Sequence, residues 1–124
     1  MAQRTDDYGI PLIVAGQAQP EVTFADAIRT LQALAVPAVE IRNDPPSTPT
    51  NGDTYIAGTT PTGAWSEWAN KIVHYYGGTW YAVPDVDDEG ADIPMGARHF
   101  GLRKFVQYYG AFFLWDGSAW VLDS

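Results

Sequence analysis

A Trp-bearing phrase that occurs twice constrains the fold of this chain more than any other feature. The first copy spans residues 71–84 and the second spans residues 111–123. In each copy an apolar run reaches a glycine turn, Gly77-Gly78 or Asp116-Gly117, and a Trp follows three residues after the first turn Gly. Glycine supplies the positive φ of two-residue hairpin turns, and aromatic and β-branched residues suit a half-buried pleated surface. The phrase therefore predicts two related β-hairpins, which are more typical of a binding or structural module than of an enzyme.

Length and charge limit what the chain can bind. Its 124 residues allow one compact domain with an arm, but not two well-buried domains. A formal net charge of −8 argues against a nucleic-acid partner, because phosphate binding depends on clustered Lys and Arg. The absence of Cys excludes disulfides and thiolate metal sites. The longest apolar run, residues 10–16, is far shorter than a bilayer span, so we expect cytosolic synthesis with neither a signal peptide nor membrane insertion.

Residues 1–22 mix polar ends, Gly and Pro with a short apolar centre, a composition that fits neither a helix nor an independent strand pair. We expect an extended arm. Its centre, Leu12, Ile13 and Val14, is costly to leave in water. It is therefore a candidate docking segment that lies along a neighbouring subunit or another protein as an added strand. The alternative is that the arm packs on its own domain.

Apolar residues at helical spacing follow the arm and predict a helix over residues 23–36. Thr23 is a good N-cap, and Pro37 prevents a further helical turn. Because isolated helices of about three turns are marginal in water, the apolar stripe needs a partner. That partner is either the chain's own β domain or the same helix in symmetry-related copies. The candidate oligomerisation residues are Phe24, Ile28, Leu31 and Leu34.

Residues 37–52 contain several Pro, Asn, Asp and Ser residues and read as a linker between the helix and the β unit. Residues 53–124 form the predicted aromatic-rich β domain. The expected fold class is therefore mainly β with one short N-terminal helix. It is a small antiparallel β domain built from two related Trp hairpins and preceded by an extended arm.

A succession of short motifs over residues 10–123 resembles a small family of phage and prophage tail proteins that is catalogued as a domain of unknown function. The motifs are Gly16-Gln-Ala-Gln19, Pro45-Pro46 with Pro49, Asn51-Gly52-Asp53-Thr54-Tyr55, Thr62-Gly63-Ala64-Trp65, Lys71-Ile72, Gly78-Thr79-Trp80 and Asp116-Gly117-Ser118-Ala119-Trp120. Each motif alone is weak, but the combination in this order is fairly specific.

The resemblance implies a virion component of the tail tip, such as a tail fibre or a fibre-attachment protein. It implies no catalytic residues, and the usual threefold symmetry of tail fibres implies a homotrimer. The chain departs from the family at Pro20, where a basic residue is expected, and over residues 85–100, where the acidic connection is longer. Details of that loop therefore do not carry over.

Motifs of catalytic or metal chemistry are missing or incomplete. The chain has no Gly-x-Ser-x-Gly, no phosphate-binding glycine loop and no His-Glu-x-x-His, so we assign no catalytic residue, cofactor or metal. His74 and His99 are not at metal-ligand spacing, and a structural role is favoured for both. Within the acidic loop 85–92, alternating carboxylates partly imitate a calcium loop. Gly96 stands where the closing Glu should be, so a solvated loop is favoured.

The five Trp and seven Tyr residues have two interpretations. Exposed rings bind sugars by stacking, whereas buried rings fill the core of a small β domain. At their repeated positions after the turns, Trp80 and Trp120 are expected to be equivalent and buried. Trp68, Tyr76 and Tyr109 are candidate receptor or glycan contacts, because each neighbours another aromatic residue or lies close to one along the chain.

We therefore expect a non-enzymatic structural component of a phage tail tip, made in the bacterial host cytoplasm and located in the virion. Its expected partners are other tail or baseplate proteins, further copies of itself in a homotrimer, and a host cell-surface glycan or protein. The main alternative is a stand-alone carbohydrate-binding module, and a small hydrolase is a remote third.

Overall fold

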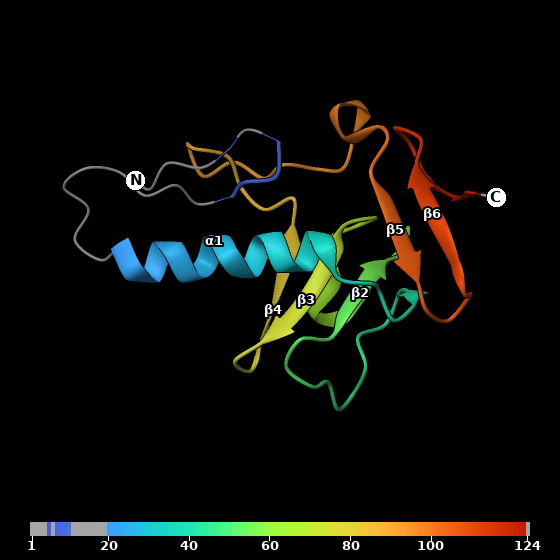
Figure 1. Ribbon diagram of the computed structural model, residues 1–124, viewed down its shortest axis with the longest axis horizontal. Coiled ribbons are helices and arrows are strands. Elements are labelled where there is room, and N and C mark those ends of the chain that lie inside the picture. Colours follow the sequence, from blue (N-terminus) through green and yellow to red (C-terminus); the bar gives the residue numbers. More distant parts are fainter. Residues whose placement is uncertain (1–4, 6, 11–19, 124) are drawn as a thin grey trace.

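The computed structural model describes residues 5, 7–10 and 20–123, and of residues 20–24 it describes the backbone only. Within this part the chain is mainly β, with two sheets and one helix near the N-terminus (Figure 1). This confirms the fold class that the sequence predicted. The centre of the predicted docking arm, with Leu12, Ile13 and Val14, lies outside the described residues.

The first sheet has four strands in the order β1-β2-β3-β4. They are β1 (Ile41–Arg42), β2 (Thr54–Ala57), β3 (Ile72–Tyr76) and β4 (Thr79–Val83). Strand β2 pairs antiparallel with β3, and β3 with β4, whereas the two-residue strand β1 pairs parallel with β2. Strand β1 lies inside the predicted 37–52 linker, so this segment both connects the helix to the β unit and adds an edge strand.

The second sheet has three antiparallel strands in the order β5-β6-β7. They are β5 (Arg103–Val106), β6 (Ala111–Trp115) and β7 (Trp120–Asp123). A parallel bridge from Ala38 to Val106 links the start of the linker to β5. The short 3-10 helices Gly63–Trp65 and Ala97–His99 precede β3 and β5.

The two predicted hairpins are β3-β4 and β6-β7, and their Trp residues are equivalent. Trp80 faces Tyr75 across the first hairpin, and Trp120 faces Trp115 across the second. Both turn glycines that begin the loops, Gly77 and Gly117, have positive φ. Burial differs from the expectation, however, because Trp80 and Trp120 are half-buried.

The rings that fill the interior are Trp65 and Trp115, which are almost inaccessible. Trp80 packs edge-on against Trp65 with ring centroids 5.0 Å apart, and Trp120 packs against Trp115 at 5.7 Å. The repeated Trp residues thus cover deeper aromatic residues that are not equivalent, since Trp65 precedes the first hairpin whereas Trp115 lies within the second.

Helix α1 (Pro20–Ala35) lies across one face of the first sheet (Figure 1). It starts before the predicted Thr23, because Pro is tolerated in the first helical turn, where its missing N–H needs no intrahelical partner. It ends at Ala35, as the following Pro37 predicts. Ala33 is buried against the sheet.

Hydrophobic clusters cover both faces of the first sheet. The cluster on the helix side joins α1 to both sheets and consists of Ala33, Ala38, Ile56, Ile72, Val83 and Val106. The cluster on the opposite side contains Tyr55, Ala57, Trp65 and Val73. Strand β2 alternates between the two clusters, which is why all four of its residues are buried.

The buried Lys104 of β5 caps the C-terminus of α1. Its ammonium donates hydrogen bonds to the carbonyl oxygens of Ala33 at 2.5 Å and Leu34 at 3.0 Å. The last carbonyls of a helix have no intrahelical donor, so this side chain satisfies two of them and ties the helix to the second sheet. Burial lowers the pKa of Lys104 from 10.5 to about 8.

This lowered pKa predicts a pH dependence of stability. Below pH 8, Lys104 is protonated in the folded and unfolded states, and between about 8 and 10.5 only the unfolded chain keeps the proton. The free energy of unfolding therefore rises with pH through this window, by at most roughly 3 kcal/mol. Urea unfolding from pH 7.5 to 10 should show this rise relative to Lys104→Met. A constant difference between the two proteins would contradict it.

Candidate functional site

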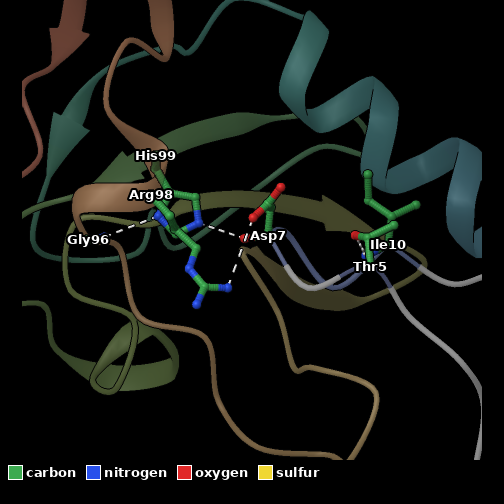
Figure 2. A network of polar contacts seen from close by, with 6 residues as sticks. All are labelled: Thr5, Asp7, Ile10, Gly96, Arg98 and His99. Carbon is green, nitrogen blue, oxygen red and sulfur yellow. Dashed lines mark hydrogen bonds and ion pairs between the residues drawn. The ribbon is translucent and has the colours of Figure 1, made fainter.

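Residues 7–10 of the N-terminal segment are bonded to the chain's own domain (Figure 2). His99 contacts the Asp7 carbonyl oxygen through Nε2 at 2.6 Å, and the Asp85 amide donates to the Tyr8 carbonyl at 3.0 Å. The Tyr8 ring lies 5.0 Å from the His99 ring and packs against the cluster on the helix side. This part of the predicted arm is therefore anchored in cis, beside the acidic loop.

The contacts of His99 define its tautomer. The Gly96 amide donates to Nδ1 at 3.1 Å, so Nδ1 is the acceptor and Nε2 carries the proton that goes to Asp7. The guanidinium of the adjacent Arg98 lies 4.0 Å from the Asp7 carboxylate. Because this ion pair is exposed, it contributes little to stability. The buried His99 is thus a structural residue, as the sequence analysis favoured, and it connects the loop at 96–99 to the N-terminal segment.

Gly9 allows the N-terminal segment to approach the acidic loop closely. Its φ is +71°, and a Cβ at this position would overlap the backbone oxygen of Val86 and lie 2.9 Å from the Val86 nitrogen. Only a residue without a side chain fits both the conformation and the distance.

Gly9→Ala is therefore expected to release residues 7–10 and to lower the free energy of unfolding by roughly 1 to 3 kcal/mol. Hydrogen exchange should detect the release as faster exchange of the Asp85 amide, which Tyr8 protects. Gly110→Ala is the matched control, because Gly110 has a φ of +62° but a Cβ added there would meet no atom within 4 Å. Equal effects of the two substitutions on Asp85 exchange would contradict this explanation.

The predicted oligomerisation residues of α1 divide between two sides of the helix. Ile28 and Leu31 are 48% and 47% exposed, and Ile28 borders a surface hollow that Arg29 and Tyr76 also line. Leu34 is partly buried and packs against the cluster on the helix side. Phe24 belongs to the segment whose side chains are not described. The helix therefore presents at least two large apolar side chains to solvent, and its sheet-facing side is more polar than the sequence pattern suggested.

Arg29 occupies the sheet-facing side of α1. It pairs with Asp26 at 2.8 Å, and its guanidinium lies over the rings of Tyr76 and Tyr81, at 4.6 and 5.1 Å from their centroids. Cation–π contacts of this kind favour a partly desolvated cation. Arg29 was not among the predicted site residues, although its spacing of three residues from Asp26 is the signal of a helical ion pair.

A small cavity opens beside Arg29, between α1 and the β3-β4 hairpin, with a volume of about 80 Å³. His74 lines it from β3, and Asp85 closes one side. His74 is buried, and its Nδ1 lies 2.9 Å from the Thr54 hydroxyl oxygen. Burial first, and then the positive charges of Arg29 and Lys104, lower the pKa of His74, so it is neutral at pH 7.

The three candidate receptor residues do not form one surface. Tyr76 lies on the helix side of the first sheet beneath Arg29, whereas Trp68 packs against the cluster on the opposite side. Tyr109 lies in the β5-β6 turn, where it is 52% exposed and contacts the Tyr108 and Phe113 rings. Tyr108 and Tyr109 together make an exposed aromatic pair. A single receptor site can therefore include only one of these three residues.

The acidic loop is organised by hydrogen bonds to its own backbone. The Asp87 carboxylate accepts the amides of Glu89 at 2.8 Å and Ala91 at 2.9 Å. Asp92 pairs with the buried Lys71 at 2.7 Å. Over residues 5, 7–10 and 20–123, no three His, Cys, Asp or Glu side chains gather closely enough to hold a metal ion. In the same residues no helix is long and apolar enough to cross a membrane.

Comparison with known proteins identifies one family. A family described as "Protein of unknown function (DUF2793)" matches residues 24–93. The match runs from α1 through both strands of the first hairpin to the end of the acidic loop, and it includes the motifs around Asp53, Trp65 and Trp80. The second hairpin lies beyond it. No curated protein matches the chain.

Proposed function

Because this chain belongs to the DUF2793 family of proteins of unknown function, we propose that it is a non-enzymatic structural component of a phage tail tip, of the tail-fibre or fibre-attachment type. The family description names no function, so the tail assignment rests on the motif resemblance in the sequence. In this proposal the protein is made in the bacterial host cytoplasm and ends in the virion.

The observation that carries the proposal is the outward apolar side of α1. Ile28 and Leu31 are about half exposed on a helix that already packs its other side on the sheet. Burying two large aliphatic side chains that one helix exposes to solvent would contribute favourable free energy to an assembly. In the proposal, three copies cover them around a threefold axis, as the symmetry of tail fibres implies, and Leu12, Ile13 and Val14 dock to a neighbouring tail or baseplate protein.

Incorporation into particles tests the proposal directly. The full chain with a C-terminal epitope tag is expressed in a bacterium during phage production, and purified particles are separated by density-gradient sedimentation. We expect the tag in the intact-particle fraction and, by immunogold microscopy, at the tail tip. A tag that stays entirely at the top of the gradient would refute the tail role.

The exposed Tyr108-Tyr109 pair favours a second candidate, a stand-alone carbohydrate-binding module. Exposed aromatic rings that lie close together are typical contacts for sugar rings. Light scattering and a glycan array on the purified chain separate the two functions. A monomer that binds glycans through Tyr109 supports the module, whereas a trimer found in particles supports the tail component.

A further inference from the structure

Asn51 and Gly52 lie in an exposed turn that precedes β2, and this dipeptide is chemically reactive. In spontaneous deamidation, the backbone nitrogen that follows an Asn attacks the carbonyl carbon of the Asn side chain. Glycine favours this attack, because it has no side chain in the way and its backbone reaches many conformations. The other two Asn residues, Asn43 and Asn70, precede residues that carry side chains.

The reaction at this dipeptide needs no reagent other than water. The Gly52 nitrogen gives up its proton and bonds to Cγ of Asn51, while the bond from Cγ to the side-chain nitrogen breaks. The departing NH2 group takes the proton and leaves as ammonia, and a five-membered succinimide remains. Water then opens the ring at either carbonyl, which gives Asp or isoaspartate. Both products carry a new carboxyl group, and nothing is oxidised or reduced.

The backbone of the folded turn keeps the reacting atoms apart. The Gly52 amide donates to the Tyr75 carbonyl oxygen of β3 at 2.8 Å, so its proton is engaged. The Asp53 amide donates to the Thr50 carbonyl at 2.9 Å, and φ is positive at Gly52 but not at Asn51, which defines a type II turn. Such a turn sets ψ of Asn51 near about +120°. This ψ directs the Gly52 nitrogen away from Cβ of Asn51, whereas ring closure requires the two atoms to be eclipsed.

The side chain of Asn51 is held by the neighbouring hairpin. Its Oδ1 accepts a hydrogen bond from the Gly77 amide in the β3-β4 turn at 3.0 Å. Because the turn at residues 50–53 is exposed, few contacts besides these hydrogen bonds need to break before it opens. Surface turns of this kind open locally at a much lower free energy than the whole domain unfolds.

We propose that Asn51 is a deamidation site that the folded turn protects, and that it reacts when residues 50–53 separate from β3 and the hairpin turn. Isoaspartate adds one carbon to the main chain between residues 51 and 52. The Gly52 amide is then displaced from the Tyr75 carbonyl when the turn closes again. The modification thus converts a transient opening into a lasting loss of this contact. Neither a tail partner nor a trimer is needed for the reaction.

Peptide mapping of the full chain after incubation at neutral pH tests the proposal. Mass spectrometry detects the replacement of the side-chain NH2 by OH at each Asn, and an isoaspartate methyltransferase labels the isoaspartyl product. In guanidinium chloride we expect Asn51 to react faster than Asn43 and Asn70. In the folded chain we expect Asn51 to react at least about tenfold more slowly than in the denaturant. Equal rates at Asn51 in the two states, or a faster reaction at Asn43 or Asn70 in the denaturant, would overturn the proposal.

A pair of variants tests whether the turn itself controls the reaction. The Asp53 carboxylate accepts the Thr50 amide at 2.9 Å, so Asp53→Ala loosens the turn without changing Asn51 or Gly52. We expect the ratio of the folded rate to the unfolded rate at Asn51 to rise severalfold. This ratio cancels any effect of residue 53 on the reactivity of the unfolded chain. Asp88→Ala removes an exposed carboxylate of the acidic loop and should leave the ratio unchanged.

Equal ratios for the two variants would refute control by the turn. If Asp53→Ala does not fold, the comparison of the folded and unfolded states of the unmodified chain still decides the question.

Discussion

Trp115→Ala is expected to lower the free energy of unfolding by about 3 to 5 kcal/mol, the usual cost of truncating a large aromatic residue in a core. Trp115 is 1% exposed, and its indole nitrogen donates to the Gly96 carbonyl at 2.8 Å. Its backbone also bonds Gly101 and Leu102, so the residue joins β6 to the loop that holds His99. Because domains are stable by only about 5 to 15 kcal/mol, this loss removes a large fraction of the stability.

Urea unfolding followed by circular dichroism measures this effect. Tyr108→Ala is the matched control, since it truncates an aromatic residue that is 69% exposed, and its effect should stay within about 0.5 kcal/mol. Trp120→Ala should fall between the two, because Trp120 is half-buried. If Trp115→Ala and Tyr108→Ala unfold at the same urea concentration, Trp115 does not have the structural role assigned to it.

Leu31→Asp is expected to convert the proposed trimer into folded monomers. Leu31 is exposed within one chain, so a charge there leaves the domain intact, but in an interface the same charge would be buried without a partner at a cost of several kcal/mol. Light scattering at micromolar concentration should show the mass falling to that of one chain, while the thermal transition of the domain remains.

Gln107→Asp is the control for this substitution, because it places the same charge on an exposed residue outside α1. We expect Gln107→Asp to remain a trimer. A monomeric mass for the unmodified chain would contradict the homotrimer. Loss of folding in Leu31→Asp would instead mean that Leu31 supports the core of its own domain.

Local features of the sequence were sufficient to predict the two Trp hairpins, although not the parallel edge strand β1. Glycine at a two-residue turn and Trp three residues later place both hairpins, since turn geometry depends on neighbouring residues alone. The end of α1 was predictable for the same reason, because Pro37 blocks the next turn. The ordered motifs predicted a family of unknown function, and a model of such a family does match residues 24–93, whereas the link to phage tails stays a prediction.

The orientation of α1 needed the tertiary structure. Its sequence pattern predicted an apolar stripe but not which side faces the sheet, and the sheet supplies Tyr76 and Tyr81, which pack on Arg29. The side of α1 that faces the sheet therefore combines Arg29 with the apolar Ala33, while Ile28 and Leu31 are about half exposed. Helical periodicity describes one element, whereas burial depends on what a distant strand presents to it.

The sequence by itself determined a small, mainly β domain with two Trp hairpins and a helix, because turn glycines, alternating apolar residues and Pro37 act over a few neighbouring residues. Only the tertiary structure decided that Trp115 is more deeply buried than Trp120, that His99 holds the N-terminal segment, and that His74 lines a cavity. Each of these depends on segments far apart in the chain, whose packing no local pattern encodes.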